Sequence, residues 1–145
     1  MDNEARKTLI VANTAMLLMT AIHDADHVRQ AINWCYTIPL WLLAVNTVVY
    51  VPNGVALFVS VLGRRQAPLA TIFGALFIAV SFSMLHLWKP LIPVWGIWNQ
   101  SFFALNADQL SWSILALTVV VAVGVAIAGG WAGGRASASF ATAAE

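Results

Sequence analysis

The sequence predicts an all-α membrane protein, a polytopic bundle of four membrane-spanning helices. Of the 145 residues, 61% are hydrophobic and 9% are charged, and the mean hydropathy is +0.81. Soluble domains carry about 25% charged residues, so this chain is far more apolar than they are. Four apolar stretches are long enough to cross a hydrocarbon core, which takes about 20 helical residues. We therefore expect one domain whose solvent is the lipid bilayer.

The four helices are expected at residues 8–33, 39–62, 68–88 and 107–130. Pro39 and Pro68 open the second and third helices, where the first helical turn tolerates proline. The triplet Pro52-Asn53-Gly54 interrupts the second helix. Neither half of that segment could span a membrane alone, so the triplet predicts a kinked helix rather than a turn between two spans.

The fourth helix has start and stop signals of its own. Asn106 can cap its first turn, with Gln109 three residues further on, and Gly129-Gly130 is expected to end it. Residues 1–132 would then form the membrane domain. The Ala-, Ser- and Gly-rich residues 133–145 predict a disordered cytoplasmic tail.

The connection between the third and fourth helices is rich in proline and aromatic residues. Pro90 and Pro93 break it, and it contains Trp95, Trp98, Phe102 and Phe103. It is too broken to span and too aromatic to extend into water. We expect it to lie in the membrane interface as an aromatic lid.

Lys and Arg side chains predict the orientation. One side of the expected bundle carries Arg6, Lys7, Arg64, Arg65 and Arg135, and the other carries Arg29 and Lys89. Cytoplasmic loops are enriched in these residues. Both termini should therefore be cytoplasmic, and the far end of the first helix should face the extracytoplasmic side.

The candidate site begins in the first helix, in the stretch His23-Asp-Ala-Asp-His-Val-Arg-Gln30. So many ionisable groups at membrane depth are costly and mark a functional region by default. On a helix, His23, Asp26, His27 and Gln30 share one stripe at i, i+3, i+4 and i+7. At a rise of 1.5 Å per residue, the distances along the helix axes from the cytoplasmic ends are roughly 22 Å to His23, 28 Å to His27 and 27 Å to His86. All three histidines should meet in the outer leaflet.

These residues favour a metal site with His23, His27, His86 and Asp26 as ligands. Three imidazole nitrogens and one carboxylate oxygen suit copper or zinc first, and iron next. Five further residues could support the ligands by hydrogen bonding: Asp24, Arg29, Gln30, Asn46 and Asp108. An enzyme built on this site would most naturally be an oxidoreductase acting on an apolar or lipid-like substrate, because the site opens toward the interface.

Three alternatives remain open at this point. The histidines and acids could form a structural polar network, with Asp24 or Asp26 paired to Arg29 and the histidines hydrogen-bonded between helices. A haem b could be held by His86 with His23 or His27, although the neighbouring acids disfavour its propionates. The chain could also be a non-catalytic subunit of a larger membrane complex, or a homo-oligomer.

Charge and cysteine content exclude two further classes of function. The formal charge of +1 offers no basic patch for nucleic acid, and the single Cys35 excludes an internal disulfide.

Several of these motifs together resemble a known group. The motifs are His23 to Gln30 on the first helix, His86 followed by Pro93-Val-Trp95, and Ser111-Trp112 at the start of the fourth helix. In these features the chain resembles an uncharacterised group of small four-helix bacterial integral membrane proteins. The resemblance implies a bacterial plasma membrane location and adds no mechanism.

Overall fold

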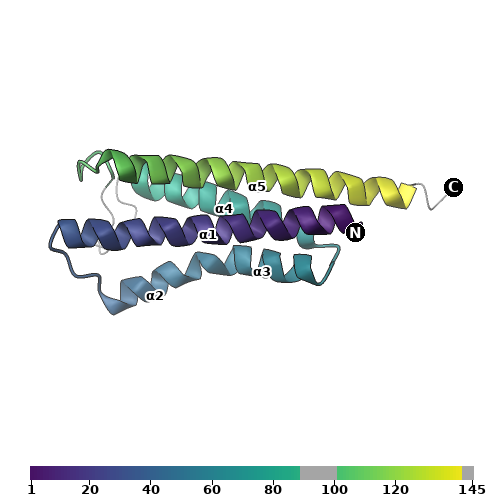
Figure 1. Ribbon diagram of the computed structural model, residues 1–145, viewed down its shortest axis with the longest axis horizontal. Helices are drawn as coiled ribbons and strands as arrows, with labels where there is room; N and C mark the ends of the chain where they lie inside the picture. Colours follow the sequence, from purple (N-terminus) through teal and green to yellow (C-terminus); the bar gives the residue numbers. More distant parts are fainter. Residues whose placement is uncertain (89–100, 142–145) are drawn as a thin grey trace.

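The computed structural model describes residues 1–88 and 101–141, apart from the side chains of Val45 and residues 137–141, and it is helical (Figure 1). The part of the chain that the structure describes contains no strand. Its helices are α1 (Asn3–Asn33), α2 (Leu40–Val48), α3 (Tyr50–Val61), α4 (Ala67–Leu87) and α5 (Gln109–Ala141). The all-α prediction is confirmed.

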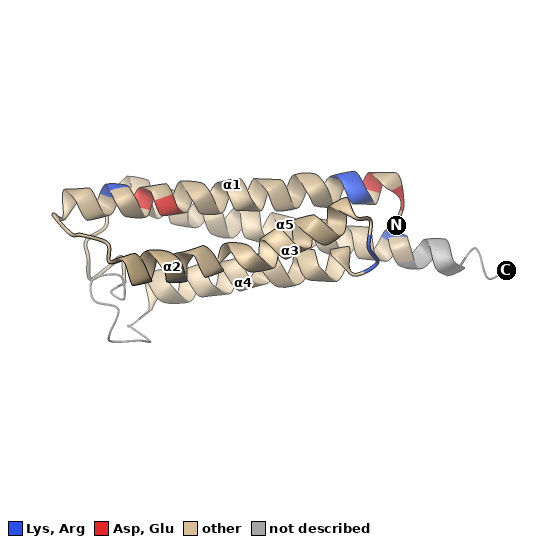
Figure 2. Ribbon diagram, turned by 90° about the horizontal axis from the view of Figure 1, so that it is seen from below, with Lys and Arg blue, Asp and Glu red and all other residues tan. Residues whose placement is uncertain are grey.

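Four segments are long and apolar enough to cross a membrane: α1, the combined α2 and α3 (Leu40–Val61), α4, and residues Gln109–Ala136 of α5. Large apolar side chains point outward along them, and Val11, Phe73 and Ile127 are 66–68% exposed. Acidic and basic residues gather toward the two ends of the bundle (Figure 2). Apolar side chains outside and polar ones inside are what a lipid solvent favours.

The order of the helices around the bundle places α1 and α4 on a diagonal. α1 packs mainly against α3 and α5, and α4 packs against the same two helices. α2 contacts α3 and diverges from α1 toward its own N-terminal end (Figure 1). Groups on the inner faces of α1 and α4 therefore meet at the bundle axis.

The interruption expected at Pro52-Asn53-Gly54 lies one turn earlier, at Val49 between α2 and α3. Pro52 has no N–H to donate to the carbonyl of Val48, and its ring crowds that carbonyl. The helix therefore breaks before the proline, and residues 52–54 themselves are helical.

The limits of α5 differ from those expected. Asp108, not Asn106, caps the helix: its Oδ1 accepts the N–H of Ser111 at 3.0 Å, while Asn106 has a left-handed φ of 49°. At the other end the helix continues through Gly129-Gly130 to Ala141. The tail expected from residue 133 is thus helical as far as Ala141, and residues 142–145 lie outside the described residues.

Gly129 serves close packing rather than helix termination. A Cβ at this position would lie 2.7 Å from Ile72 Cγ1 and 3.0 Å from the carbonyl oxygen of Pro68. Small residues let membrane helices approach this closely. α5 therefore passes over the start of α4, and packing against α4 stabilises the helix where the isolated sequence predicts its end.

α1 begins at Asn3, five residues before the expected start. The side chain of Asp2 caps it by accepting the N–H of Ala5 at 2.8 Å, and Asp2 also pairs with Arg135 of α5 at 3.1 Å. The Ala5 N–H and the Arg135 guanidinium lower the pKa of Asp2. The start of α1 is thus joined to the last part of α5 at one end of the bundle.

We expect Gly129→Ala to lower the free energy of unfolding by about 1–3 kcal/mol, because the added methyl group overpacks the α4–α5 contact. Gly130→Ala is the matched control, since nothing lies within 4 Å of a Cβ there. That change should be neutral or stabilising by up to about 1 kcal/mol. Reversible unfolding in mixed micelles measures both, and equal effects would contradict the assigned role of Gly129.

Candidate metal centre

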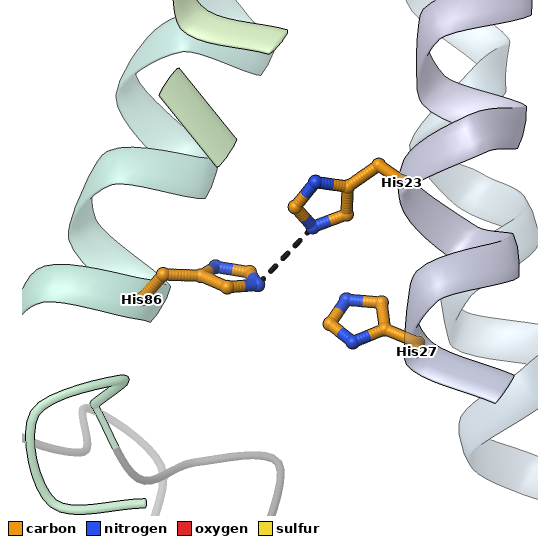
Figure 3. Close-up of side chains that lie close together, drawn as sticks. All are labelled: His23, His27 and His86. Carbon is orange, nitrogen blue, oxygen red and sulfur yellow. Dashed lines mark hydrogen bonds between the residues drawn. The ribbon is translucent and has the colours of Figure 1, made fainter. Parts of the chain in front are cut away.

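Three histidines meet at the bundle axis (Figure 3). His23 and His27 stand one helical turn apart on α1, and His86 comes from the last turn of α4. Their exposed fractions are 2%, 8% and 7%. One possible ligand atom from each side chain lies within 4.8 Å of the others. The convergence predicted from helix depth is confirmed.

A hydrogen bond assigns the proton of the His86 ring to Nδ1. His86 Nδ1 lies 3.0 Å from the carbonyl oxygen of Phe82, and a carbonyl only accepts. His23 Nδ1 lies 3.4 Å from Thr118 Oγ1. Thr118 donates its own proton to the carbonyl of Ile114 at 2.7 Å, so its oxygen can accept from His23 when that ring is protonated at Nδ1.

The Nε2 atom of His86 therefore carries a lone pair, and it faces the Nε2 atom of His23 at 3.2 Å, the contact drawn as a dashed line in Figure 3. This contact is a hydrogen bond when His23 is protonated at Nε2, and it places two lone pairs side by side when His23 is protonated at Nδ1. Two lone pairs at this distance repel unless a cation lies between them. Two nitrogens bound to one tetrahedral ion at 2.0–2.1 Å would be about 3.3 Å apart. The spacing is therefore close to that of two ligands on a single metal ion.

Aromatic rings enclose the histidines. The Phe82 ring is 4.4 Å from the His23 ring, centroid to centroid, and the Phe102 ring is 4.6 Å from that of His86, edge to face. The Phe102 N–H also donates to the His86 carbonyl at 2.8 Å. Phe102 belongs to the expected aromatic lid, but residues 89–100 lie outside the described residues, and the lid as a whole stays a prediction.

Asp26 is not among the side chains that gather at the histidine nitrogens. Its Oδ1 accepts from Arg29 Nε and its Oδ2 from Gln30 Nε2, each at 2.7 Å. Residues three and four positions on can reach it along one helix, and a guanidinium is a stronger partner for a carboxylate than a neutral imidazole. The structure therefore places Asp26 in an ion pair and leaves three histidines as the candidate ligands.

Arg29, Gln30 and Asp108 join α1 to α5 instead of supporting the imidazoles. Arg29 makes two hydrogen bonds to the Asp108 carboxylate, at 2.7 and 2.9 Å. Arg29 and Gln30 both donate to Ser111 Oγ, at 2.8 and 2.6 Å. The Arg29 side chain, and then the Ser111 N–H, hold the pKa of Asp108 well below its usual range. The structural network considered from the sequence is thus present: Asp26 pairs with Arg29 beside the histidines, and His23 contacts His86 between α1 and α4.

The remaining two expected supporting residues border the other side of the site. Asp24 accepts a hydrogen bond from the Tyr50 hydroxyl at 2.6 Å. Asn46 lines two small cavities together with His27. The larger, of about 110 Å³, also includes Asp24, and the smaller, of about 50 Å³, also includes His86.

Sequence reasoning missed Thr118, Tyr50 and the carbonyl of Phe82. Thr118 lies seven residues after Ser111, on the same face of α5, so a search for polar residues at helical spacing would have found it. Tyr50 follows Asn46 by one turn and could have been found in the same way. The role of the Phe82 carbonyl has no such signal, because it depends on the rotamer of His86.

Comparisons of the chain with protein families, curated proteins and solved structures find no match. The geometry of the site is therefore the basis for a functional proposal.

The α1–α5 network leads to a stability prediction. Arg29→Gln would leave the Asp26 carboxylate, whose side chain is 4% exposed, without its cation. Since Arg29 itself is 32% exposed, we expect a loss of about 2 kcal/mol, less than for a fully buried pair. Asp108→Asn should cost under about 1 kcal/mol, because that pair is open to solvent. Unfolding in mixed micelles compares the two, and equal losses would contradict the burial argument.

The stabilisation by the Arg29–Asp108 pair should depend on pH in a defined direction. The folded pKa of Asp108 is lowered, so its stabilisation is complete above the unfolded value of about 3.9 and is lost as pH falls toward the folded one. The difference in unfolding free energy between the native chain and Asp108→Asn should therefore shrink below about pH 4. A difference that grew with acid would contradict the assignment.

Proposed function

We propose that this chain is a small integral membrane protein that binds one transition-metal ion through His23, His27 and His86. The observation that carries the proposal is the approach of the His23 and His86 Nε2 atoms to 3.2 Å, with a third imidazole within reach of the same point. Without a metal, the tautomer of His23 protonated at Nε2 would form a direct His23–His86 hydrogen bond. A metal ion would replace that proton and bind both Nε2 atoms.

The ligand set supports zinc or copper as the metal. Three imidazoles are a common set for zinc with a fourth position left for water or substrate, and imidazole also suits copper. Non-haem iron sites commonly add a carboxylate, and Asp26 is engaged by Arg29 and Gln30. Iron is therefore the weaker proposal. Copper would bring one-electron chemistry to the site, whereas zinc would act as a Lewis acid.

A haem fits the site poorly. The cavities that border the histidines measure about 110 and 50 Å³. Pockets for large organic ligands measure roughly 300–1,000 Å³. Edge-to-face packing of His86 on Phe102 also occupies the space beside that ring.

Elemental analysis of the purified, zinc- or copper-reconstituted protein should give about one metal ion per chain, as expected for one three-histidine site. His23→Ala, His27→Ala and His86→Ala should each lose most of it. Asp26→Asn is the matched control and should keep it, because that carboxylate faces Arg29. Metal should also be released in acid, since protonated imidazoles do not bind metal.

Two results would contradict this proposal. Loss of metal in Asp26→Asn with a retained helical spectrum would restore Asp26 as a ligand. A native protein that holds no metal after reconstitution would leave a polar network, and would favour a non-catalytic subunit of a larger membrane complex.

We also propose that both termini are cytoplasmic and that the histidines lie toward the extracytoplasmic side of a bacterial plasma membrane. Cation distribution supports this orientation: Arg6, Lys7, Arg64, Arg65 and Arg135 belong to the end of the bundle that holds both termini. A reporter fused after Glu145 should be active in the cytoplasm, and one inserted near Asn99 should be active outside. The opposite pattern would place the histidines on the cytoplasmic side.

A further inference from the structure

We infer that the metal keeps one coordination position for a small exogenous ligand, either water or hydroxide or a di- or triatomic molecule or anion, which enters from the cavities between α1, α2 and α4. This inference rests on the proposed metal site. It specifies what that site would bind and from which side.

The cavities border only one side of the histidine cluster. His27 lines both cavities and His86 lines the smaller one, whereas His23 lines neither. His23 is packed against Phe82 and Thr118. An ion held by the three rings would therefore have its open position on the side of the cluster away from His23, where Asn46 lines the cavities.

The arrangement of the helices explains why space remains there. α2 diverges from α1 ahead of the break at Val49 (Figure 1). Leu43 and Thr47 of α2 line the larger cavity opposite Asp24 of α1. The cavity thus lies between two helices that separate.

Cavity size limits the ligand class. A water molecule takes about 30 Å³ of liquid volume. The larger cavity, of about 110 Å³, therefore has room for about three or four waters, and the smaller, of about 50 Å³, for about one or two. A diatomic or triatomic ligand fits such a space. A whole lipid or a long-chain quinone needs a pocket of roughly 300–1,000 Å³, which argues against the lipid-like substrate considered from the sequence.

Charge favours an anionic ligand among these small molecules. A divalent ion on three neutral imidazoles has two uncompensated positive charges at membrane depth, where such charges are costly. Asp26 is already paired with Arg29 at 2.7 Å. The Asp24 carboxylate lines the larger cavity, so an anion meets the least repulsion in the smaller one, whose described lining residues include no acid. The Asn46 side chain lines both cavities beside His27, and its amide can donate a hydrogen bond to a bound anion.

The test uses Co(II) as the metal and azide as the ligand, with the full-length protein in detergent. Co(II) uptake should give d–d absorption bands, and azide should shift them with saturation. Asn46→Phe fills the space beside His27 and should keep Co(II) but abolish the azide response. Asn46→Leu keeps the side-chain size and should weaken azide binding by about tenfold, the loss expected for one hydrogen bond to a charged ligand.

Ala116→Phe is the matched control. Ala116 is an exposed residue of α5 in a groove against α4, formed with Ser83, Trp112 and Val119. The cavities beside His27 do not include these residues. This variant adds a ring elsewhere on the bundle and should leave both Co(II) uptake and the azide response unchanged.

The outcomes separate this inference from the proposed function. A native protein that takes up no Co(II) would overturn the metal site itself. Co(II) bands that azide leaves unchanged would keep the metal site and overturn the open position. An azide response that is the same in Asn46→Phe, Asn46→Leu and the native protein would overturn entry through these cavities.

Discussion

The contact on which the site depends is the approach of the His23 and His86 Nε2 atoms to 3.2 Å across the diagonal of the bundle. Diagonal helices share few contacts of their own, so the distance between α1 and α4 is set by the helices that pack against both. The surrounding packing holds the two ring nitrogens at this distance, which is how a metal site is prepared before the ion binds.

α5 provides much of that support, because it contacts both diagonal partners. Arg29 and Gln30 fix α1 to Ser111 at its start, Thr118 orients His23 from its middle, and Gly129 lets it lie close to α4. A second polar contact between α1 and α4 lies deeper in the bundle, where the Asn13 side chain donates a hydrogen bond to Thr71 Oγ1 at 2.8 Å. Between these two polar contacts, Met16 and Met19 of α1 belong to one buried apolar cluster with Ile78 and Phe82 of α4. Polar contacts and apolar packing together thus fix the spacing of α1 and α4.

Length and composition were sufficient to predict four spans, and residue spacing with helical rise was sufficient to bring three histidines to one level. These properties depend on side-chain type and on regular helix geometry, and not on side-chain rotamers. The partner of Asp26 could not be predicted in this way, because Arg29 and the histidines are both within its reach and side-chain rotamers decide between them. The end of α5 could not be predicted either. A glycine that ends an isolated helix can instead permit close contact with a neighbouring helix, as Gly129 does with Pro68 and Ile72.

The 100° advance per residue explains how one short stretch of α1 serves three neighbours. Measured from His23, His27 is turned by about 40° and Gln30 by about 20° the other way, so they stay near the bundle axis. Asp24 is turned by about 100° toward α3, where Tyr50 meets it. Asp26 and Arg29 are turned by about 60° and 120° the opposite way, toward α5, where Asp108 and Ser111 lie. The two aspartates therefore have different partners because they lie on different sides of the histidine stripe. Asp26 is ion-paired on one flank of the helix and Asp24 is hydrogen-bonded on the other, and the imidazoles on the stripe between them face one another.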